Sequence, residues 1–129
     1  MSKIVLDTSA VLAYLFEETG AEKVAPVFES GAAVISSANY AETVSKLFDL
    51  KMPAEAIQVT LDSLEMECIP LSEEQAFITG KLRLVSKAFG LSLGDRACLA
   101  LGISNKYAVY TADKAWAKVP SEVEVVLIR

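Results

Sequence analysis

The chain has 129 residues and 53% of them are apolar, so length and composition predict one folded domain with a hydrophobic core. Histidine is absent, which excludes Ser-His-Asp and Cys-His catalysis as well as imidazole metal sites. The formal net charge of −5 argues against a simple nucleic-acid binder, although residues 81–129 carry 8 basic and 4 acidic side chains against 4 and 13 in residues 1–80.

The first half of the chain alternates short strands with helices. Apolar, β-prone runs predict the strands, and apolar residues at helical spacing predict the helices. Pro53 fits the first turn of the last helix in this half. In chain order, we predict a strand over residues 3–7, helices over 9–18 and 21–30, a strand over 33–35, and helices over 40–50 and 53–66.

The second half begins with a brief extended segment over residues 67–70. Ser72 and Gln75 form a capping-box signal, which predicts one long helix over residues 72–90. The remaining predicted elements are a very apolar helix over 94–105 and strands over 108–110 and 123–128.

This alternation predicts an α/β fold, with a mostly parallel sheet covered by helices on both faces and a single domain over residues 1–129. In such sheets, ligands bind beyond the carboxyl ends of the strands. Two predicted strands end there in similar motifs, Leu-Asp-Thr with Asp7 and Tyr-Thr-Ala-Asp with Asp113. The two carboxylates meet if their strands are neighbours.

Two cysteines, Cys68 and Cys98, are too few for a disulfide framework or a cysteine-rich zinc site. Each has apolar neighbours, so we predict two buried free thiols. No apolar run approaches the roughly 20 residues of a membrane span, and the N-terminus lacks the pattern of a signal peptide. We therefore expect a cytoplasmic protein without a membrane segment.

Two further carboxylates lie where helices are predicted to begin, Glu42 in Asn-Tyr-Ala-Glu and Asp95 in Leu-Gly-Asp-Arg. Each acidic residue has a structural interpretation when taken alone. Asp7, Asp95 and Asp113 can cap helices, and Glu42 can be an exposed residue in a first turn. For any single residue this interpretation is the simpler one.

Taken together, the four carboxylates favour a metal site. Strand ends and the helix starts that follow them crowd onto one edge of the sheet, and like charges there raise one another's pKa. Mg²⁺ or Mn²⁺ resolves this conflict, because both ions prefer carboxylate oxygens and retained waters. The hydroxyls of Thr8, Ser9 and Thr111 would then orient the carboxylates or a bound water.

Four motifs carry a family resemblance: Val-Leu-Asp-Thr-Ser-Ala, Asn-Tyr-Ala-Glu-Thr-Val, Leu-Ser-Leu-Gly-Asp-Arg-Ala and Tyr-Thr-Ala-Asp-Lys. In this order and over the whole chain, the sequence resembles the PIN-domain ribonucleases, and most closely the VapC-like toxins of toxin–antitoxin pairs. The resemblance implies a PIN-like three-layer α/β/α domain. It also implies an Mg²⁺- or Mn²⁺-dependent endoribonuclease that hydrolyses RNA and leaves a 5′-phosphate.

Residue by residue, the resemblance places the catalytic and metal site on Asp7, Glu42, Asp95 and Asp113, with Ser9 or Thr111 as supporting hydroxyls. Asp95 would be either a ligand or the group that positions the attacking water. Some relatives carry a further acid after the fourth motif, where this chain has Ala115 and Trp116, so the number of metal ions stays open. The candidate RNA contacts are Arg96, Lys114 and Lys118, whose alternative is a solvated basic face.

The resemblance also implies a homodimer and a small antitoxin partner. The helices predicted over residues 21–66 are rich in apolar side chains, which fits an exposed groove for a partner helix. Ordinary packing between these helices is the alternative, and the sequence does not decide between the two.

Three other functions share features with this sequence. A phosphatase of the haloacid-dehalogenase type needs a second Asp two residues after the first, where this chain has Ser9, and a receiver domain needs an acidic pair that is missing. A catalytically inactive PIN scaffold that binds protein or RNA remains compatible with the sequence. The presence of all four acids favours activity.

Overall fold

The computed structural model describes residues 2–129. Five strands form one sheet in the order β3-β2-β1-β4-β5, and each neighbouring pair is parallel. The strands are β1 (Ile4–Leu6), β2 (Ala33–Ser36), β3 (Glu67–Ile69), β4 (Ala108–Thr111) and β5 (Val125–Leu127). The prediction of an α/β fold with a parallel sheet is confirmed.

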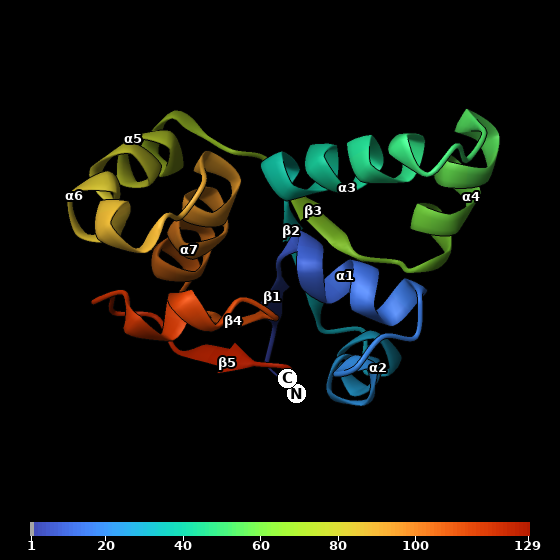
Figure 1. The fold of residues 1–129 in the computed structure, drawn as a ribbon, viewed down its shortest axis with the longest axis horizontal. Coiled ribbons are helices and arrows are strands. Elements are labelled where there is room, and N and C mark those ends of the chain that lie inside the picture. The colour runs from blue at the N-terminus through green and yellow to red at the C-terminus, as the bar shows by residue number, and fades with distance from the viewer. Residues whose placement is uncertain (1) are drawn as a thin grey trace.

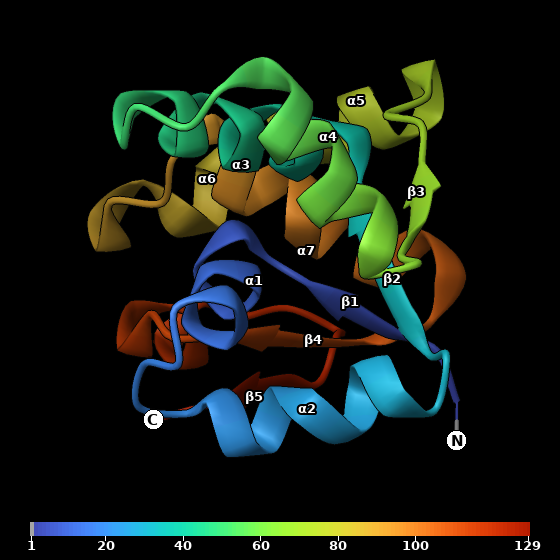
Figure 2. The same ribbon diagram turned by 90° about the vertical axis from the view of Figure 1, so that its right-hand side faces the viewer.

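Helices cover both faces of this sheet. They are α1 (Thr8–Leu15), α2 (Ala21–Glu29), α3 (Ser37–Asp49), α4 (Ala54–Ser63), α5 (Glu73–Lys81), α6 (Arg83–Ser86) and α7 (Leu93–Asn105), with 3-10 helices η1 (Lys87–Phe89) and η2 (Lys114–Lys118). In Figure 1, α1 and α2 lie on one side of β1, and α5, α6 and α7 lie on the other. Figure 2 shows α1 and α2 in front of the sheet and α7 behind it. The arrangement is a three-layer α/β/α fold.

The alternation of side chains along β1 explains the three layers. Ile4 and Leu6 pack into one hydrophobic cluster with residues of α1 and α2. Val5, between them, packs into a second cluster with residues of α7 and with Trp116. Successive residues of a strand point to opposite faces, so a fully apolar strand requires a hydrophobic cover on both sides.

The predicted single helix over residues 72–90 is wrong, because the chain forms α5, α6 and η1 in succession. At the break, the carbonyl of Thr79 accepts a hydrogen bond of 3.1 Å from Nη1 of Arg96 on α7. In a continuous helix this carbonyl would accept from the backbone N–H of Arg83. A side chain that inserts into the helical hydrogen-bond ladder is a known cause of a bend.

The prediction of two buried thiols is half correct. Cys98 on α7 is buried, whereas Cys68 is exposed. Cys68 lies on β3, which is at the edge of the sheet and is mostly exposed. An edge strand has one unpaired side and fewer covering elements, which local apolarity cannot reveal.

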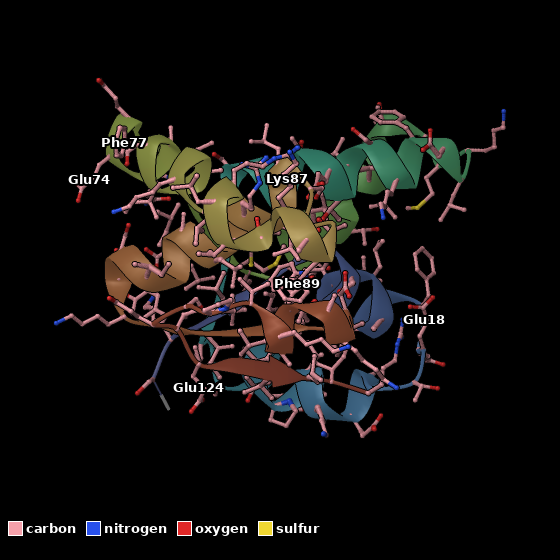
Figure 3. The ribbon with its side chains drawn as sticks, turned by 60° about the vertical axis from the view of Figure 1, so that its left-hand side comes forward. Glu18, Glu74, Phe77, Lys87, Phe89 and Glu124 are labelled. Atoms are coloured by element: carbon pink, nitrogen blue, oxygen red, sulfur yellow. The ribbon has the colours of Figure 1, made fainter. Side chains whose placement is uncertain are left out.

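Several large apolar side chains on α5 and α6 remain in solvent. Phe77 is 76% exposed and Leu84 is 81% exposed. In Figure 3, Phe77 and Glu74 are labelled on α5 at the edge of the molecule. Within residues 2–129, every helix falls short of the length and apolar character that a membrane crossing requires.

Candidate active site

The acidic residues gather at the carboxyl edge of the sheet. Strands β1 and β4 are parallel neighbours, with Leu6 opposite Tyr110. Asp7 follows β1 directly, and Asp113 lies two residues after the end of β4. The condition for the two carboxylates to meet, that their strands are neighbours, is therefore fulfilled.

Asp7 is the most constrained of the four carboxylates, with 4% of its surface exposed. It caps α1, because Oδ1 accepts hydrogen bonds from the backbone N–H of Ala10 (2.8 Å) and from Oγ of Ser9 (2.7 Å). Its other oxygen, Oδ2, accepts from Oγ1 of Thr111 at 2.6 Å. Burial raises the pKa of Asp7 to about 6, although these three hydrogen bonds act to lower it.

Ser9 and Thr111 also tie the two strand ends together. Oγ of Ser9 accepts a hydrogen bond from the backbone N–H of Ala112 (2.9 Å), and Oγ1 of Thr111 accepts one from the backbone N–H of Asp113 (3.0 Å). Asp113 is exposed and caps η2 through a bond from the backbone N–H of Ala115 to Oδ1 (2.9 Å). The hydroxyl of Thr111 thus contacts the Asp7 side chain and the Asp113 backbone.

Glu42 reaches the same edge from α3. This helix begins at Ser37, three residues earlier than predicted, so Glu42 lies in its second turn. Oε1 of Glu42 accepts hydrogen bonds from Nδ2 of Asn39 (2.8 Å) and from Oγ1 of Thr8 (3.1 Å). On its far side, the carboxylate lies against Gly94 of α7, where an added Cβ would come within 2.3 Å of Oε2.

Asp95 belongs to a capping box at the start of α7. Oδ2 of Asp95 accepts from the backbone N–H of Ser92 (2.9 Å), and Oγ of Ser92 accepts from the backbone N–H of Asp95 (3.1 Å). Burial raises the pKa of Asp95, as do the nearby charges of Glu42 and Asp113, while the bonds to Ser92 lower it. The charge of Asp95 in turn raises the pKa of Asp7. Through these effects on Asp7 and Asp95, all four carboxylates belong to one electrostatic group.

The donor chemistry of this group fits a hard divalent cation, because all of its side-chain donors are carboxylate or hydroxyl oxygens. The ion pairs found within residues 2–129 lie elsewhere, between Lys3 and Glu67 and between Arg129 and Glu18. In the same part of the chain, no three Asp, Glu, Cys or His side chains are arranged as a set of metal ligands. Water molecules, which Mg²⁺ retains readily, would therefore have to fill part of a ligand shell.

This geometry supports the structural interpretation of three of the acidic residues. Asp7, Asp95 and Asp113 do cap helices, as their simpler interpretation predicts. The caps fix the direction of each carboxylate and do not remove it from the shared edge. Capping and convergence are compatible here because helix starts and strand ends meet on the same side of the sheet.

The three candidate RNA contacts differ in their surroundings. Lys114 and Lys118 are exposed on η2, directly after Asp113. Arg96 is 9% exposed and is occupied by the carbonyl of Thr79, so it cannot reach phosphates at the surface. We remove Arg96 from the predicted RNA-binding surface.

Two residues at the site were not singled out from the sequence. Asn39 and Gly94 both contact Glu42. A spacing of three residues on a helix does place Asn39 on the same face as Glu42. Gly94 offers no comparable signal, because its contact is made across the interface between α3 and α7.

Comparisons with known proteins agree with this architecture. The family model described as PIN domain matches residues 4–122. A toxin–antitoxin complex from Klebsiella pneumoniae is 20% identical, with a TM-score of 0.75 and 98% of each chain covered. VapBC2 from Rickettsia felis, bound to a DNA fragment from its promoter, is 19% identical, with a TM-score of 0.74 over 96% of this chain and 97% of that chain.

DNA-bound VapBC from Salmonella typhimurium is 16% identical, with a TM-score of 0.73 and 100% of each chain covered. At these identities, the likeness to solved structures shows a shared fold. No curated protein matches the sequence.

Proposed function

This chain belongs to the PIN-domain family, and on that premise we propose that it is a metal-dependent endoribonuclease, the toxin of a toxin–antitoxin pair acting in the cytoplasm. One observation carries the proposal. Four carboxylates from β1, α3, α7 and the end of β4 form one electrostatic group, and burial together with mutual repulsion raises the pKa of Asp7 and of Asp95. Such a group favours a divalent cation as its partner.

Asp7, Glu42 and Asp113 would hold Mg²⁺ or Mn²⁺, and Asp95 would either join them or position the attacking water. A bound ion of this kind supplies positive charge to the scissile phosphate and lowers the pKa of a water. Ser9 and Thr111 keep the Asp7 carboxylate in place, with 2.7 Å and 2.6 Å hydrogen bonds to its two oxygens. Because the carboxylates are held before the substrate arrives, little reorganisation is needed.

The RNA backbone would approach along η2. Lys114 and Lys118 are exposed there, next to Asp113. Lysine side chains neutralise phosphates without reading bases, so they would position the strand and leave sequence choice to other contacts. The basic balance of residues 81–129 supports binding on this side despite the net charge of the chain.

A groove between α1 and α3 suits the helix of a small antitoxin. It runs from Ser9 at the site to exposed apolar side chains, and its lining is Ser9, Leu12, Phe16, Glu18, Lys46, Asp49, Leu50 and Arg129. Phe16 and Leu50 are 45% and 59% exposed. An amphipathic helix could bury them and bring an arginine or lysine to Asp7 or Asp113, which would compete with the cation.

We also propose that the chain pairs as a homodimer. The exposed Phe77 and Leu84 give α5 and α6 an apolar surface of the kind that interfaces use. Light scattering on the wild type and on Leu84→Glu tests this, since a charge at an apolar interface should produce monomers.

The function is tested with purified protein, RNA, and Mg²⁺ or Mn²⁺, each with and without EDTA. Cleavage should require the cation, leave 5′-phosphate ends and disappear in Asp7→Asn. A folded wild-type protein that neither binds Mn²⁺ nor cleaves any RNA would instead indicate an inactive PIN scaffold that serves as a binding module.

A further inference from the structure

We propose that Asn39 and Gly94 are positioning residues that set the place of the Glu42 carboxylate between α3 and α7 and thereby its strength as a metal ligand. The inference rests on the proposed function, because it assigns these residues a role toward the metal. It concerns two uncharged residues, Asn39 and Gly94, that act through their contacts with Glu42.

Asn39 links the two helices through a single amide nitrogen. Its Nδ2 donates to Oε1 of Glu42 (2.8 Å) and to the backbone carbonyl of Gly94 (3.0 Å), so both of its hydrogens are used. The side chain is 1% exposed, and its Oδ1 is buried without a partner in residues 2–129. A buried unpaired acceptor costs stability, which indicates that the two donations determine how this amide is oriented.

The hydrogen bonds on Glu42 leave one of its oxygens available. Asn39 and Thr8 both donate to Oε1. Within the described chain, Oε2 therefore keeps its lone pairs for another ligand. Two donors on one oxygen fix the rotation of the carboxylate, so the free oxygen has a defined direction.

Gly94 closes the other side of the carboxylate. A Cβ added to Gly94 would lie 2.3 Å from Oε2, 2.4 Å from Cδ and 2.4 Å from Oε1. Three nearly equal distances place this added Cβ over the face of the carboxylate, out of the plane that contains its lone pairs. A methyl group at this position would push the whole carboxylate out of its place.

The helix itself therefore does not explain why residue 94 is a glycine. Alanine is the better helix former, and Gly94 has no positive φ that would demand glycine. Gly80 on α5 provides a matched control, because an added Cβ there meets nothing within 4 Å and its φ is also ordinary. Gly80→Ala and Gly94→Ala make the same chemical change in two helices, and only the second one touches Glu42.

The experiment measures Mn²⁺ affinity by calorimetry on the full chain, together with the Mn²⁺ concentration that gives half-maximal RNA cleavage. We expect Gly94→Ala to weaken Mn²⁺ binding by about tenfold or more, which is the scale for loss of an outer-shell partner, while Gly80→Ala matches the wild type. Cleavage by Gly94→Ala should recover at high Mn²⁺, because the ligand is displaced and not removed. A general structural defect would lack this recovery.

A double-mutant cycle adds a test of the contact itself. Glu42→Asp shortens the side chain by one methylene and makes room for the new methyl group. Its loss of Mn²⁺ affinity should therefore be smaller in the Gly94→Ala background than in the wild type. Additive losses would show that the two residues do not act on each other and would overturn the inference.

The remaining outcomes separate this inference from the proposed function. A wild type that binds Mn²⁺, beside a Gly94→Ala variant that binds it equally well, overturns the inference alone. A wild type that binds no Mn²⁺ overturns the proposed function and the inference with it. If Gly94→Ala fails to fold, Asn39→Ala carries the test, and unchanged Mn²⁺ affinity in that folded variant is the result that would overturn the role of Asn39.

Discussion

The candidate site consists of two parts that hold their carboxylates by different means. In the strand-end half (Asp7, Ser9, Thr111 and Asp113), each hydrogen bond comes from a near neighbour in sequence or from the adjacent strand β4. In the helix half (Asn39, Glu42, Gly94 and Asp95), Glu42 is held by the Asn39 amide and the Thr8 hydroxyl. Across the interface between α3 and α7, Asn39 bonds to the carbonyl of Gly94, whose lack of a side chain leaves room for the carboxylate.

Each half combines a contact that local sequence can encode with a contact that only the packed fold makes, since Thr111 is 104 residues from Asp7 and Asn39 is three residues from Glu42. Ser9 is two residues from Asp7, and a capping geometry alone brings the two together. Asn39 and Gly94 are 55 residues apart, so their contact exists only after α3 and α7 have packed on the sheet. Variants in the two halves should therefore differ in how activity and stability change together.

The largest effect should come from the ligands themselves. Asp7→Asn in one half and Glu42→Gln in the other should each lower RNA cleavage by more than about 100-fold, the upper end of what an outer-shell change costs. Asp7→Asn should fold, since asparagine caps a helix as well as aspartate does. Glu42→Gln should also fold, since glutamine keeps an oxygen that can accept from Asn39 and Thr8. Cleavage assays with thermal melts check this. Retained activity in either variant would show that its half is structural.

A pH-dependent change in stability should be traceable to Asp7 in the strand-end half. Asp7 binds its proton more tightly in the folded protein, where its pKa is about 6, than in the unfolded chain, where it is 3.8. The resulting stabilisation is full below pH 4 and disappears as pH rises through 6, a loss of about 3 kcal/mol. Urea unfolding of metal-free protein should show this loss in the wild type relative to Asp7→Asn. Parallel pH profiles would contradict it.

Removing one supporting hydroxyl should lower RNA cleavage more in the strand-end half than in the helix half. Thr111→Val removes the bond to Oδ2 of Asp7 and the acceptor for the Asp113 backbone, so cleavage should fall by about 10- to 100-fold. Thr8→Val should cost less than about tenfold, because Asn39 still donates to Glu42. Steady-state cleavage rates of the two near-isosteric variants test this order. A larger loss in Thr8→Val than in Thr111→Val would contradict it.

The smallest effect should separate capping from metal binding. Ser92→Ala removes the hydroxyl that accepts from the backbone N–H of Asp95 and so loosens the first turn that carries Asp95, although the Ser92 backbone N–H can still donate to its carboxylate. Ser72→Ala removes the equivalent hydroxyl cap of α5. Each should lower the free energy of unfolding by about 1 kcal/mol. Only Ser92→Ala should also change Mn²⁺ affinity in calorimetry. Equal Mn²⁺ affinity in both variants would mean that metal binding at Asp95 does not depend on the Ser92 hydroxyl.

Much of the fold was readable from the sequence because its strands and helices are locally consistent. The apolar runs over residues 3–7 and 108–110 predict strands of a mostly parallel sheet, and the structure adds that the two strands are neighbours. The helix boundaries were less accurate where a tertiary contact intervened. Arg96 reaches the carbonyl of Thr79 at the point where α5 ends, and no local pattern in residues 72–90 reports a side chain that arrives from α7.

The sequence by itself determined the alternation of strands and helices and the four acidic positions at the predicted edge, because both depend on residue type and short spacing. Only the tertiary structure decided that Arg96 is buried, that Cys68 is exposed, and that Asn39 and Gly94 hold Glu42. Burial and contacts across 55 residues depend on how finished elements pack against one another. A glycine whose importance is the space it leaves has no chemical signature until its neighbour is in place.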